Sequence, residues 1–427
     1  MKNKYQINWE RGKISIIDKT LRDINNFCCI ICGDWAPINN TFNLQRNNEM
    51  SIFGNLDMYF KNSDFNILNI ECVIANDGKK IIKAGPHLKC RIEKLNILED
   101  TPFHLACLAN NHARDYGDGG LLNTISLLKE IGLDTVGAGK KNSYSQKPYK
   151  LQNDCCKLAI INAAEGEAAL PVNCGPGVAS FDLSRVAFQI KELKRKGFFV
   201  IGIFHVGREF VPIPPVYIYE SFHFLADSGI DMIIGHHPHI VQGIEIYYGV
   251  PIFYSIGNFL FYQKTDNPLQ HLGMMLQCHF SKKKLQTIKI IPYKINKNSI
   301  NSLDNIEEKR FFNDIKILSI HLNDYDVTEF WNYYCSLFDV DDLLPSKKLK
   351  KTNQQEYYAR IINRIETPAH RNLMISSAKI KLNGLEEYSK WVVELCSKYK
   401  IVDEEMNLIS RFYNKIRKKL KLNYSSK

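Results

Sequence analysis

Three histidines fall within four positions of the segment Gly235-His-His-Pro-His239, which directly follows an apolar run. Neutral imidazole is a common ligand of transition metals. Because side chains alternate along a strand and Pro238 introduces a bend, we expect His237 and His239 to converge as a pair. In the alternative register His236 is the ligand and His237 points away. The segment therefore predicts metal binding.

Metal-capable side chains follow apolar runs at five places in the chain. They are Asp34, Glu71, Asn111 with His112, His205, and the 236–239 cluster. A single histidine after a strand is more often a surface residue, so it is the recurrence that favours a shared site. The carboxyl ends of neighbouring strands meet at one rim of an open α/β sheet, and we expect these side chains to meet there. A mixed oxygen and nitrogen set suits Mn²⁺, Zn²⁺ or Fe, and it is large enough for two ions sharing a carboxylate.

The elements that would position these residues follow an alternating pattern from about residue 24 to 322, which is typical of an α/β domain. We expect strands at 27–33, 65–70, 104–109, 157–162, 198–204, 231–234, 252–255 and 285–292. We expect helices at 119–131, 185–196 and 216–228. Beyond residue 323 helical periodicity dominates, at 329–338, 355–362 and 386–395, with an exposed loop at 345–352. The sequence therefore predicts a domain over 24–322 and a helical C-terminal region over 323–427.

The composition is that of a folded protein, with 45% hydrophobic and 24% charged residues among 427. Apolar runs are far shorter than the roughly 18 residues of a membrane-spanning helix, and the N-terminus lacks a signal-peptide core. We therefore expect a cytoplasmic protein. Many of the twelve cysteines lie in apolar runs, as buried reduced thiols do. Cys29 and Cys32 would face opposite sides of a strand, which argues against a thiolate site.

Positive charge is concentrated at the C-terminus, where residues 411–427 hold seven cations and no acidic residue. Phe412, Ile416, Leu420 and Tyr424 recur there at helical spacing. The more common interpretation is a solvated helix end. The functional interpretation is contact with an anionic polymer or with the inner face of the membrane.

Seven short motifs carry a resemblance to a known family. They are Gly33-Asp34, Asn69-Ile-Glu71, Asn110-Asn-His-Ala-Arg-Asp-Tyr-Gly117, Gly137-Ala-Gly139, His205-Val-Gly-Arg-Glu209, Gly235-His-His-Pro-His239 and Tyr254-Ser-Ile-Gly-Asn-Phe259. Over about residues 24–300 the chain resembles the CapA family, named for poly-γ-glutamate capsule synthesis, within the calcineurin-like metallophosphoesterase superfamily. The resemblance implies a four-layer αββα sandwich, in which two mixed sheets lie between helices and two divalent ions bind at one sheet edge.

The resemblance also implies roles for individual residues. Asp34 and His239 would bind the first ion, and Glu71 stands where the superfamily usually has a bridging aspartate. Asn111, His205 and His237 would bind the second ion, and His112 would protonate the leaving group or hold the phosphate. The superfamily's first motif is Asp-x-His, but this chain has Ala36 at the histidine position. We therefore expect the first ion to be held weakly or to be absent.

Four further residues are candidates for supporting roles. Asp115 is placed to accept a hydrogen bond from His112 and fix its tautomer, or to cap the following helix. Arg208 and Glu209 either contact an anionic substrate or form a plain surface pair. Asn258 either lines the substrate pocket or belongs to a tight turn with Gly257.

These observations lead to three functional hypotheses. The first is a metal-dependent hydrolase that acts on a phosphoester or related bond in the biosynthesis of a capsule or another surface polymer, with His112 as proton donor. The second is a non-catalytic accessory protein that binds an anionic polymer or the polymer-synthesis machinery at the membrane. The third, a nucleic-acid phosphodiesterase, rests on positive charge alone and is the least favoured.

Overall fold

Two β-sheets form the centre of the protein. The computed structural model describes residues 5–16, 26–42, 51–165, 169–170, 175–265, 267–281, 284–384 and 387–399. Within these residues the larger sheet has nine strands in the order β1-β2-β18-β17-β3-β4-β7-β8, with β19 paired to β18. They are β1 (Tyr5–Asn8), β2 (Lys13–Ile16), β3 (Asn26–Trp35), β4 (Phe65–Ile70), β7 (Leu105–Cys107), β8 (Asp134–Val136), β17 (Leu272–Ser281), β18 (Lys284–Ile295) and β19 (Ile300–Ser302). Strands β3, β4, β7 and β8 run parallel, whereas β17 and β18 are antiparallel, so the sheet is mixed.

The second sheet has six strands in the order β10-β11-β13-β14-β16-β15. They are β10 (Tyr149–Gln152), β11 (Lys157–Ala164), β13 (Phe199–His205), β14 (Met232–His236), β15 (Ile244–Tyr247) and β16 (Val250–Phe253). Its four central strands are parallel and both edge strands are antiparallel. Two small ribbons pair β5 (Val73–Ile74) with β6 (Lys89–Cys90) and β9 (Ala138–Gly139) with β12 (Gly177–Val178).

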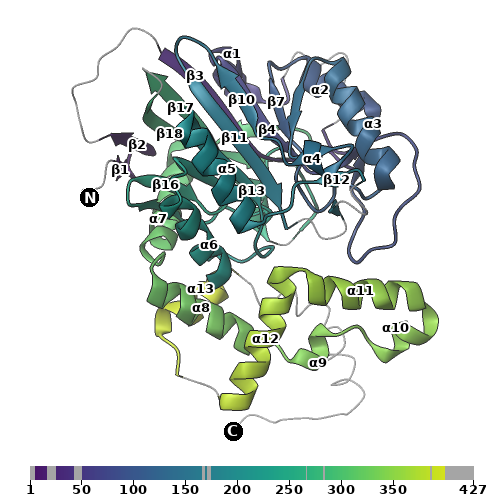
Figure 1. The fold of residues 1–427 in the computed structure, drawn as a ribbon. Coiled ribbons are helices and arrows are strands. Elements are labelled where there is room, and N and C mark those ends of the chain that lie inside the picture. The colour runs from purple at the N-terminus through teal and green to yellow at the C-terminus, as the bar shows by residue number, and fades with distance from the viewer. Residues whose placement is uncertain are drawn as a thin grey trace.

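Apolar side chains join the two sheets and attach helices to their outer faces. One large cluster contains Ile31 of β3 together with Ile160 and Ile201 of the six-stranded sheet. The outer face of that sheet is covered by α5 (Leu183–Arg195) and α6 (Val216–Asp227), which lie in front of it in Figure 1. A second cluster packs the other face of the nine-stranded sheet against the segments that include α1 (Asp57–Lys61), α2 (Asn96–Glu99) and α3 (Gly117–Glu130). The expected four-layer αββα arrangement is therefore confirmed.

Short helical segments complete this part of the chain. They are α4 (Asn142–Ser145) and the 3₁₀ turns Gly54–Leu56, Ile92–Leu95 and Pro268–His271. Each expected strand and helix overlaps an observed one, and shifts at the ends are a few residues. Strand β17 was not expected, because its Met and Leu residues favour helix as readily as strand. Cys29 and Cys32 belong to the apolar clusters on opposite faces of β3, as expected.

The C-terminal region is helical, as predicted. Its helices are α8 (Asp324–Ser336), α9 (Val340–Leu343), α10 (Lys347–Thr352), α11 (Gln354–Glu366), α12 (Pro368–Asn383) and α13 (Lys390–Lys398). Helix α7 (Asn305–Ile320) precedes them and lies within the range expected for the α/β domain. Phe330, Leu373 and Val392 lie in the same apolar cluster as the sheets, so α8, α12 and α13 pack directly on the domain. The boundary at residues 322 and 323 stays a prediction.

The segment 345–352 is largely exposed as expected, but the loop assignment is wrong, because most of it forms α10. Ser346 caps this helix, its hydroxyl accepting a hydrogen bond of 3.2 Å from the backbone N–H of Leu349. No side chain of α10 is buried, so no apolar periodicity marked it as a helix. The basic segment 411–427 lies outside the described residues. Among those described, no helix has the length and apolar character needed to cross a bilayer.

Candidate metal centre

The predicted metal ligands meet at the seam between the two sheets. In the nine-stranded sheet, Asp34 is in register with Asn69, and in the six-stranded sheet His205 is in register with His236. A contact of 2.8 Å between Asp34 Oδ1 and His236 Nδ1 joins the two sheets. The strand ends thus converge as the alternating α/β pattern predicted.

Glu71 lies at the middle of the cluster. It follows β4, and its backbone N–H donates to the carbonyl of Trp35 at 2.9 Å. Its carboxylate is fully buried, and neither oxygen has a hydrogen-bond partner among the described residues. Oε1 lies 3.2 Å from Nε2 of His205 and 3.6 Å from Nε2 of His239. Burial, and then the charge of Asp34, raise the pKa of Glu71 well above its ordinary value. A buried carboxylate without a donor is costly unless a cation is shared with it.

Two groups of donor atoms share Glu71. Asp34 and His239 form the first group with it, and His205 and His237 form the second; within each group the donor atoms lie within 4.8 Å of one another. The second group is extended by Asn111, whose Oδ1 is 3.1 Å from Nε2 of His205. These donors are carboxylate and amide oxygens with imidazole nitrogens, a set that fits divalent transition metals. The buried, unpartnered oxygens of Glu71 are what a bridging ligand would present.

The carboxylate of Asp34 is held through one oxygen. Asn69 Nδ2 donates to Oδ1 at 2.7 Å, on the same oxygen that contacts His236, while the buried Oδ2 has no hydrogen-bond partner among the described residues. Oδ2 lies 3.6 Å from Nδ1 of His239. Burial alone would raise the pKa of Asp34, but the charge of His236 and its hydrogen bond outweigh it, so the pKa is lowered. Asp34 is therefore oriented with one oxygen directed toward the first group.

Backbone conformation places the three neighbouring histidines differently. His237 and His239 have φ angles of 96° and 57°, in the left-handed region that residues other than glycine seldom adopt. Such strain costs about 1–3 kcal/mol per residue and is concentrated at functional sites. His237 reaches His205, with 3.1 Å between Nδ1 and Nε2, whereas His236 contacts Asp34. Both face the site, so the alternative in which His237 points away does not describe the structure.

Asn258 orients His239. Its Oδ1 lies 2.9 Å from Nδ1 of His239, and its Nδ2 donates to the carbonyl of Gln270 at 3.1 Å. An amide oxygen only accepts, so the imidazole carries its proton on Nδ1 and its Nε2 lone pair lies on the side of Glu71. These contacts fix the ring of a candidate ligand. The predicted substrate contact of Asn258 stays a prediction.

His112 is held by a buried pair of charges. Its Nδ1 lies 2.8 Å from Oδ2 of Asp115, which also accepts the backbone N–H of Leu88 at 2.6 Å. Lys83 pairs with Oδ1 of Asp115, and its Nζ is 3.3 Å from Nδ1 of His112. The capping alternative for Asp115 is wrong, because Tyr116 occupies the N-cap of α3 and no side chain caps it.

Electrostatics in this trio favour a neutral imidazole beside an ionised carboxylate. Burial and the charge of Lys83 lower the pKa of His112. Burial would raise the pKa of Asp115, but its hydrogen bond to His112 and the lysine charge leave it lowered. With the proton of His112 held on Nδ1 by Asp115, Nε2 is the nitrogen that can exchange a proton.

Arg208 and Glu209 diverge although they are adjacent. The carboxylate of Glu209 joins His237 and His239 in a third group of donor atoms within 4.8 Å. Burial would raise the pKa of Glu209, but these two imidazoles outweigh it. Arg208 is buried and turns toward the helical region, where its Nε donates to the hydroxyl of Tyr334 at 3.3 Å. The surface-pair alternative is therefore wrong for Arg208, and Glu209 has the geometry of a further ligand.

Several residues of the site carried no usable sequence signal. Lys83 lies in a polar loop with other lysines, and nothing in its spacing distinguishes it. His370 and Arg364, which contact each other beside Arg208, lie outside the expected helices and more than one hundred positions beyond the last histidine of the 236–239 cluster. Asn69 could have been identified, since it belongs to the same motif as Glu71.

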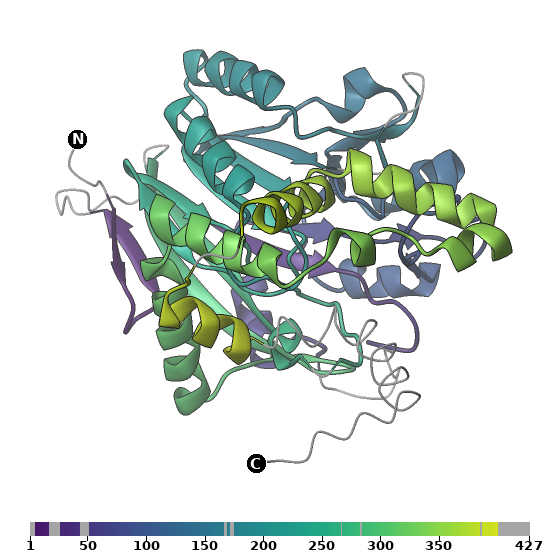
Figure 2. The same ribbon diagram turned by 90° about the horizontal axis from the view of Figure 1, so that it is seen from below.

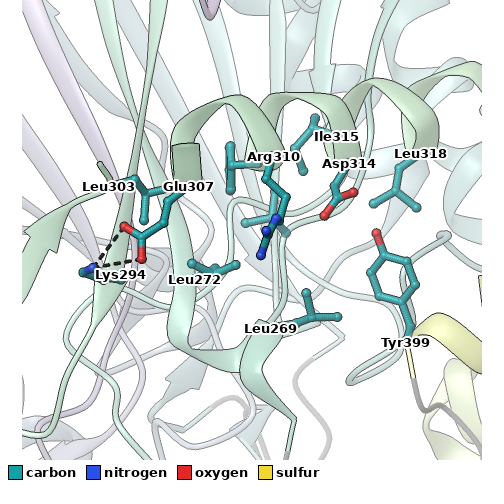
Figure 3. Close-up of a pocket in the computed structure, with 12 residues that line it drawn as sticks. Leu269, Leu272, Lys294, Leu303, Glu307, Arg310, Asp314, Ile315, Leu318 and Tyr399 are labelled. Carbon is teal, nitrogen blue, oxygen red and sulfur yellow. Dashed lines mark hydrogen bonds and ion pairs between the residues drawn. The ribbon is translucent and has the colours of Figure 1, made fainter. Parts of the chain in front are cut away.

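The pocket in Figure 3 differs from this site. Its volume is about 200 Å³, and it lies along α7, with the ion pair of Lys294 and Glu307 at one end and Tyr399 at the other. Leu269, Leu272 and Leu318 contribute an apolar lining. None of the candidate metal ligands lines it.

Comparisons with known proteins indicate the same family as the sequence motifs. The family model described as "Bacterial capsule synthesis protein PGA_cap" matches residues 29–263. The "PGA biosynthesis protein CapA" of Bacillus subtilis is 30% identical over 249 residues, which are 57% of this chain and 65% of that protein. A "Probable polyglutamine synthesis accessory protein" of Mycobacterium tuberculosis is 29% identical over 209 residues, covering 46% of this chain and 55% of that protein. The matched region spans less than two thirds of either relative.

Likeness to solved structures is weak. A dimetal phosphatase from Danio rerio is 8% identical with a TM-score of 0.30, covering 49% of this chain and 87% of that one.

Proposed function

Because the chain belongs to the family of bacterial capsule synthesis proteins, we propose that it is a metal-dependent hydrolase acting in the biosynthesis of a capsule or another surface polymer. The proposed reaction is cleavage of a phosphoester or a related bond. The observation that carries this proposal is Glu71, a fully buried carboxylate without hydrogen-bond partners among the described residues, shared by two groups of donor atoms.

Each group would hold one divalent ion. Asp34, Glu71 and His239 would hold the first, and Glu71, Asn111, His205 and His237 the second. Ions held there would supply Lewis-acid activation of water and stabilisation of the leaving oxygen. The buried Ala36 offers no donor to the first group, so the first ion would be the weaker one. Glu209 lies close enough to His237 and His239 to serve as a further ligand.

The proton transfer would belong to His112. In the neutral ring Nε2 carries no proton, so it would first take one from the attacking water and then pass it to the leaving oxygen, and Asp115 would stabilise the imidazolium formed in between. Lys83 would keep Asp115 ionised by pairing with it. Asp115 and Lys83 are thus positioning residues, whereas His112 touches the reacting group.

The test is metal analysis of the purified full chain together with a panel of generic phosphomonoesters and phosphodiesters. We expect bound transition metal and metal-dependent hydrolysis. Glu71→Ala should abolish both, and His239→Ala should abolish hydrolysis while removing only part of the metal, each with retention of the folded state. Glu394→Ala is the control, because this glutamate is exposed on α13. A chain that binds no metal, or hydrolyses nothing with any divalent metal, would contradict the proposal.

An accessory role without catalysis is the second candidate. It is favoured by Ala36 at the position of the motif histidine and by the description of the mycobacterial relative as an accessory protein. In that case activity would be negligible in every metal, while removal of residues 411–427 would abolish association with an anionic polymer or with anionic liposomes. Unchanged association after that removal would contradict this role for the basic tail.

A further inference from the structure

Helices outside the family match reach the candidate metal centre. The match ends at residue 263, yet α11 and α12 lie on the side of the molecule toward which β11 and β13 point (Figure 1). Seen from below, the same two helices lie in front of the strands (Figure 2). His370 of α12 contacts Arg208, whose neighbour in the chain, Glu209, belongs to the third group of donor atoms. Burial, Arg208, Arg364 and His237 together lower the pKa of His370 to about 2. The helical region therefore contributes to the surroundings of the site.

Two guanidinium groups converge on His370. Its Nδ1 lies 2.9 Å from an Nη atom of Arg208 and 2.7 Å from an Nη atom of Arg364. A guanidinium group can only donate, so Nδ1 is the acceptor and the neutral ring carries its proton on Nε2. The three side chains come from three segments: the loop after β13, α11 and α12. Tertiary packing thus gathers two permanent positive charges and an imidazole N–H donor.

Helix α11 also lines a cavity next to Lys83. Together with the loop at residues 82–84 it borders a space of about 350 Å³, which is lined by Lys83, the acidic Glu366 and several apolar side chains. Lys83 is the residue that pairs with Asp115 behind His112.

We propose that Arg208, Arg364 and His370 form an oxyanion-binding wall beside the metal centre, which takes an anionic group of the substrate. This inference rests on the proposed function, because it names the class of substrate for that site. The planar fork of a guanidinium group matches phosphate and carboxylate oxygens in a bidentate manner. Positive charge next to the cleavage site would also draw a polyanion toward it. A purely structural role, fixing α12 to the domain, is the competing explanation.

The test compares Arg364→Gln with Arg360→Gln in the full chain. Arg360 lies on the same helix, is half exposed and pairs with Glu356, so it is a matched control. Binding of inorganic phosphate and of tri-γ-glutamate is measured by calorimetry on chelator-treated protein, which separates the wall from binding by metal ions. We expect Arg364→Gln to weaken binding of at least one probe by about tenfold or more, and Arg360→Gln to leave it unchanged.

The two probes identify which anionic group is bound, and the hydrolysis assay tests the proposed function independently of anion binding. Weakening with phosphate alone assigns a phosphoryl group to the wall, weakening with tri-γ-glutamate alone assigns a carboxylate, and weakening with both supports a general oxyanion site. His370→Gln, which keeps an amide donor, gives a second variant if Arg364→Gln unfolds. The inference is overturned if wild-type protein binds neither probe, or if the Arg364 and Arg360 variants bind alike. Anion binding without hydrolysis would instead leave the wall standing and refute the hydrolase.

Discussion

The two sheets contribute different chemistry to one site. The strand ends of the nine-stranded sheet supply oxygen donors from Asp34, Glu71 and Asn111, whereas those of the six-stranded sheet supply imidazoles from His205, His237 and His239. Each of the two three-residue groups that contain Glu71 has donors from both sheets. Neither sheet alone offers a complete set for one ion, so metal binding would stabilise the packing of one sheet on the other.

The candidate ligands also differ in the hydrogen bonds that orient their side chains. Asp34 accepts hydrogen bonds from Asn69 and His236, and His239 is oriented by the hydrogen bond that it donates to Asn258. The carboxylate of Glu71 has no such support among the described residues. Ligands that have hydrogen-bond partners can lose one contact and keep their orientation, whereas the carboxylate of Glu71 would be stabilised only by the bound ions. Variants on the two sides of the seam should therefore have effects of different size.

Glu71→Gln should have the largest effect, because Glu71 belongs to both groups. We expect loss of both ions, measured by elemental analysis, while the metal-free protein becomes more stable by about 1–3 kcal/mol as an ionisable buried group is removed. The pKa of Glu71 is raised in the folded protein, so this residue destabilises the metal-free chain increasingly as pH rises from its ordinary value of 4.5 through the raised one. The melting temperature of chelator-treated Glu71→Gln should therefore exceed that of wild type by more at pH 8 than at pH 5. Equal metal content, or a lower melting temperature at pH 8, would refute the bridging position.

His205→Gln and His239→Gln should each remove one ion. Because Ala36 leaves the first group short of an imidazole, we expect His205→Gln to retain less metal than His239→Gln after dialysis. His223→Gln is the control, since His223 contacts Glu245 away from the cluster. The same metal loss in both variants would show that the two groups are equally strong.

Asn258→Ala and Asn69→Ala should weaken metal affinity without removing a ligand. Residues that orient ligands typically contribute about 10–100-fold to metal affinity. Asn258 orients an imidazole of the six-stranded sheet, and Asn69 orients a carboxylate of the nine-stranded sheet. The two variants therefore compare how much ligand orientation in each sheet contributes to metal affinity. Titration with a competing chelator measures the metal dissociation constant of each variant. Affinities equal to wild type would show that ligand orientation is fixed by packing alone.

Lys83→Met should have the smallest effect on metal content, and it should change the pKa of His112. The lysine charge lowers the pKa of His112, so its removal should raise that pKa toward the ordinary value of 6.5. The titration is followed by the NMR signals of the imidazole, and Lys80→Met in the same exposed loop is the control. An unshifted His112 would show that Lys83 acts on Asp115 alone.

The sequence by itself indicated which side chains would come together and at which edge of the sheets. Apolar runs mark buried strands because only such segments can be covered on both faces, and the metal-capable residues directly after them must then lie at strand ends. Asp34, Glu71, Asn111, His205, His237 and His239 were found in this way or through motif resemblance. The structure gathers them around Glu71 as expected.

Only the tertiary structure decided which side chains face one another across the seam. Lys83 lies in a polar loop, and Arg364 and His370 lie on helices whose periodicity describes only their own packing face. Nothing local distinguishes such residues from solvated ones, because their role depends on partners that can be more than one hundred positions away. Sequence patterns encode elements and faces, whereas contacts between elements arise only when those faces pack.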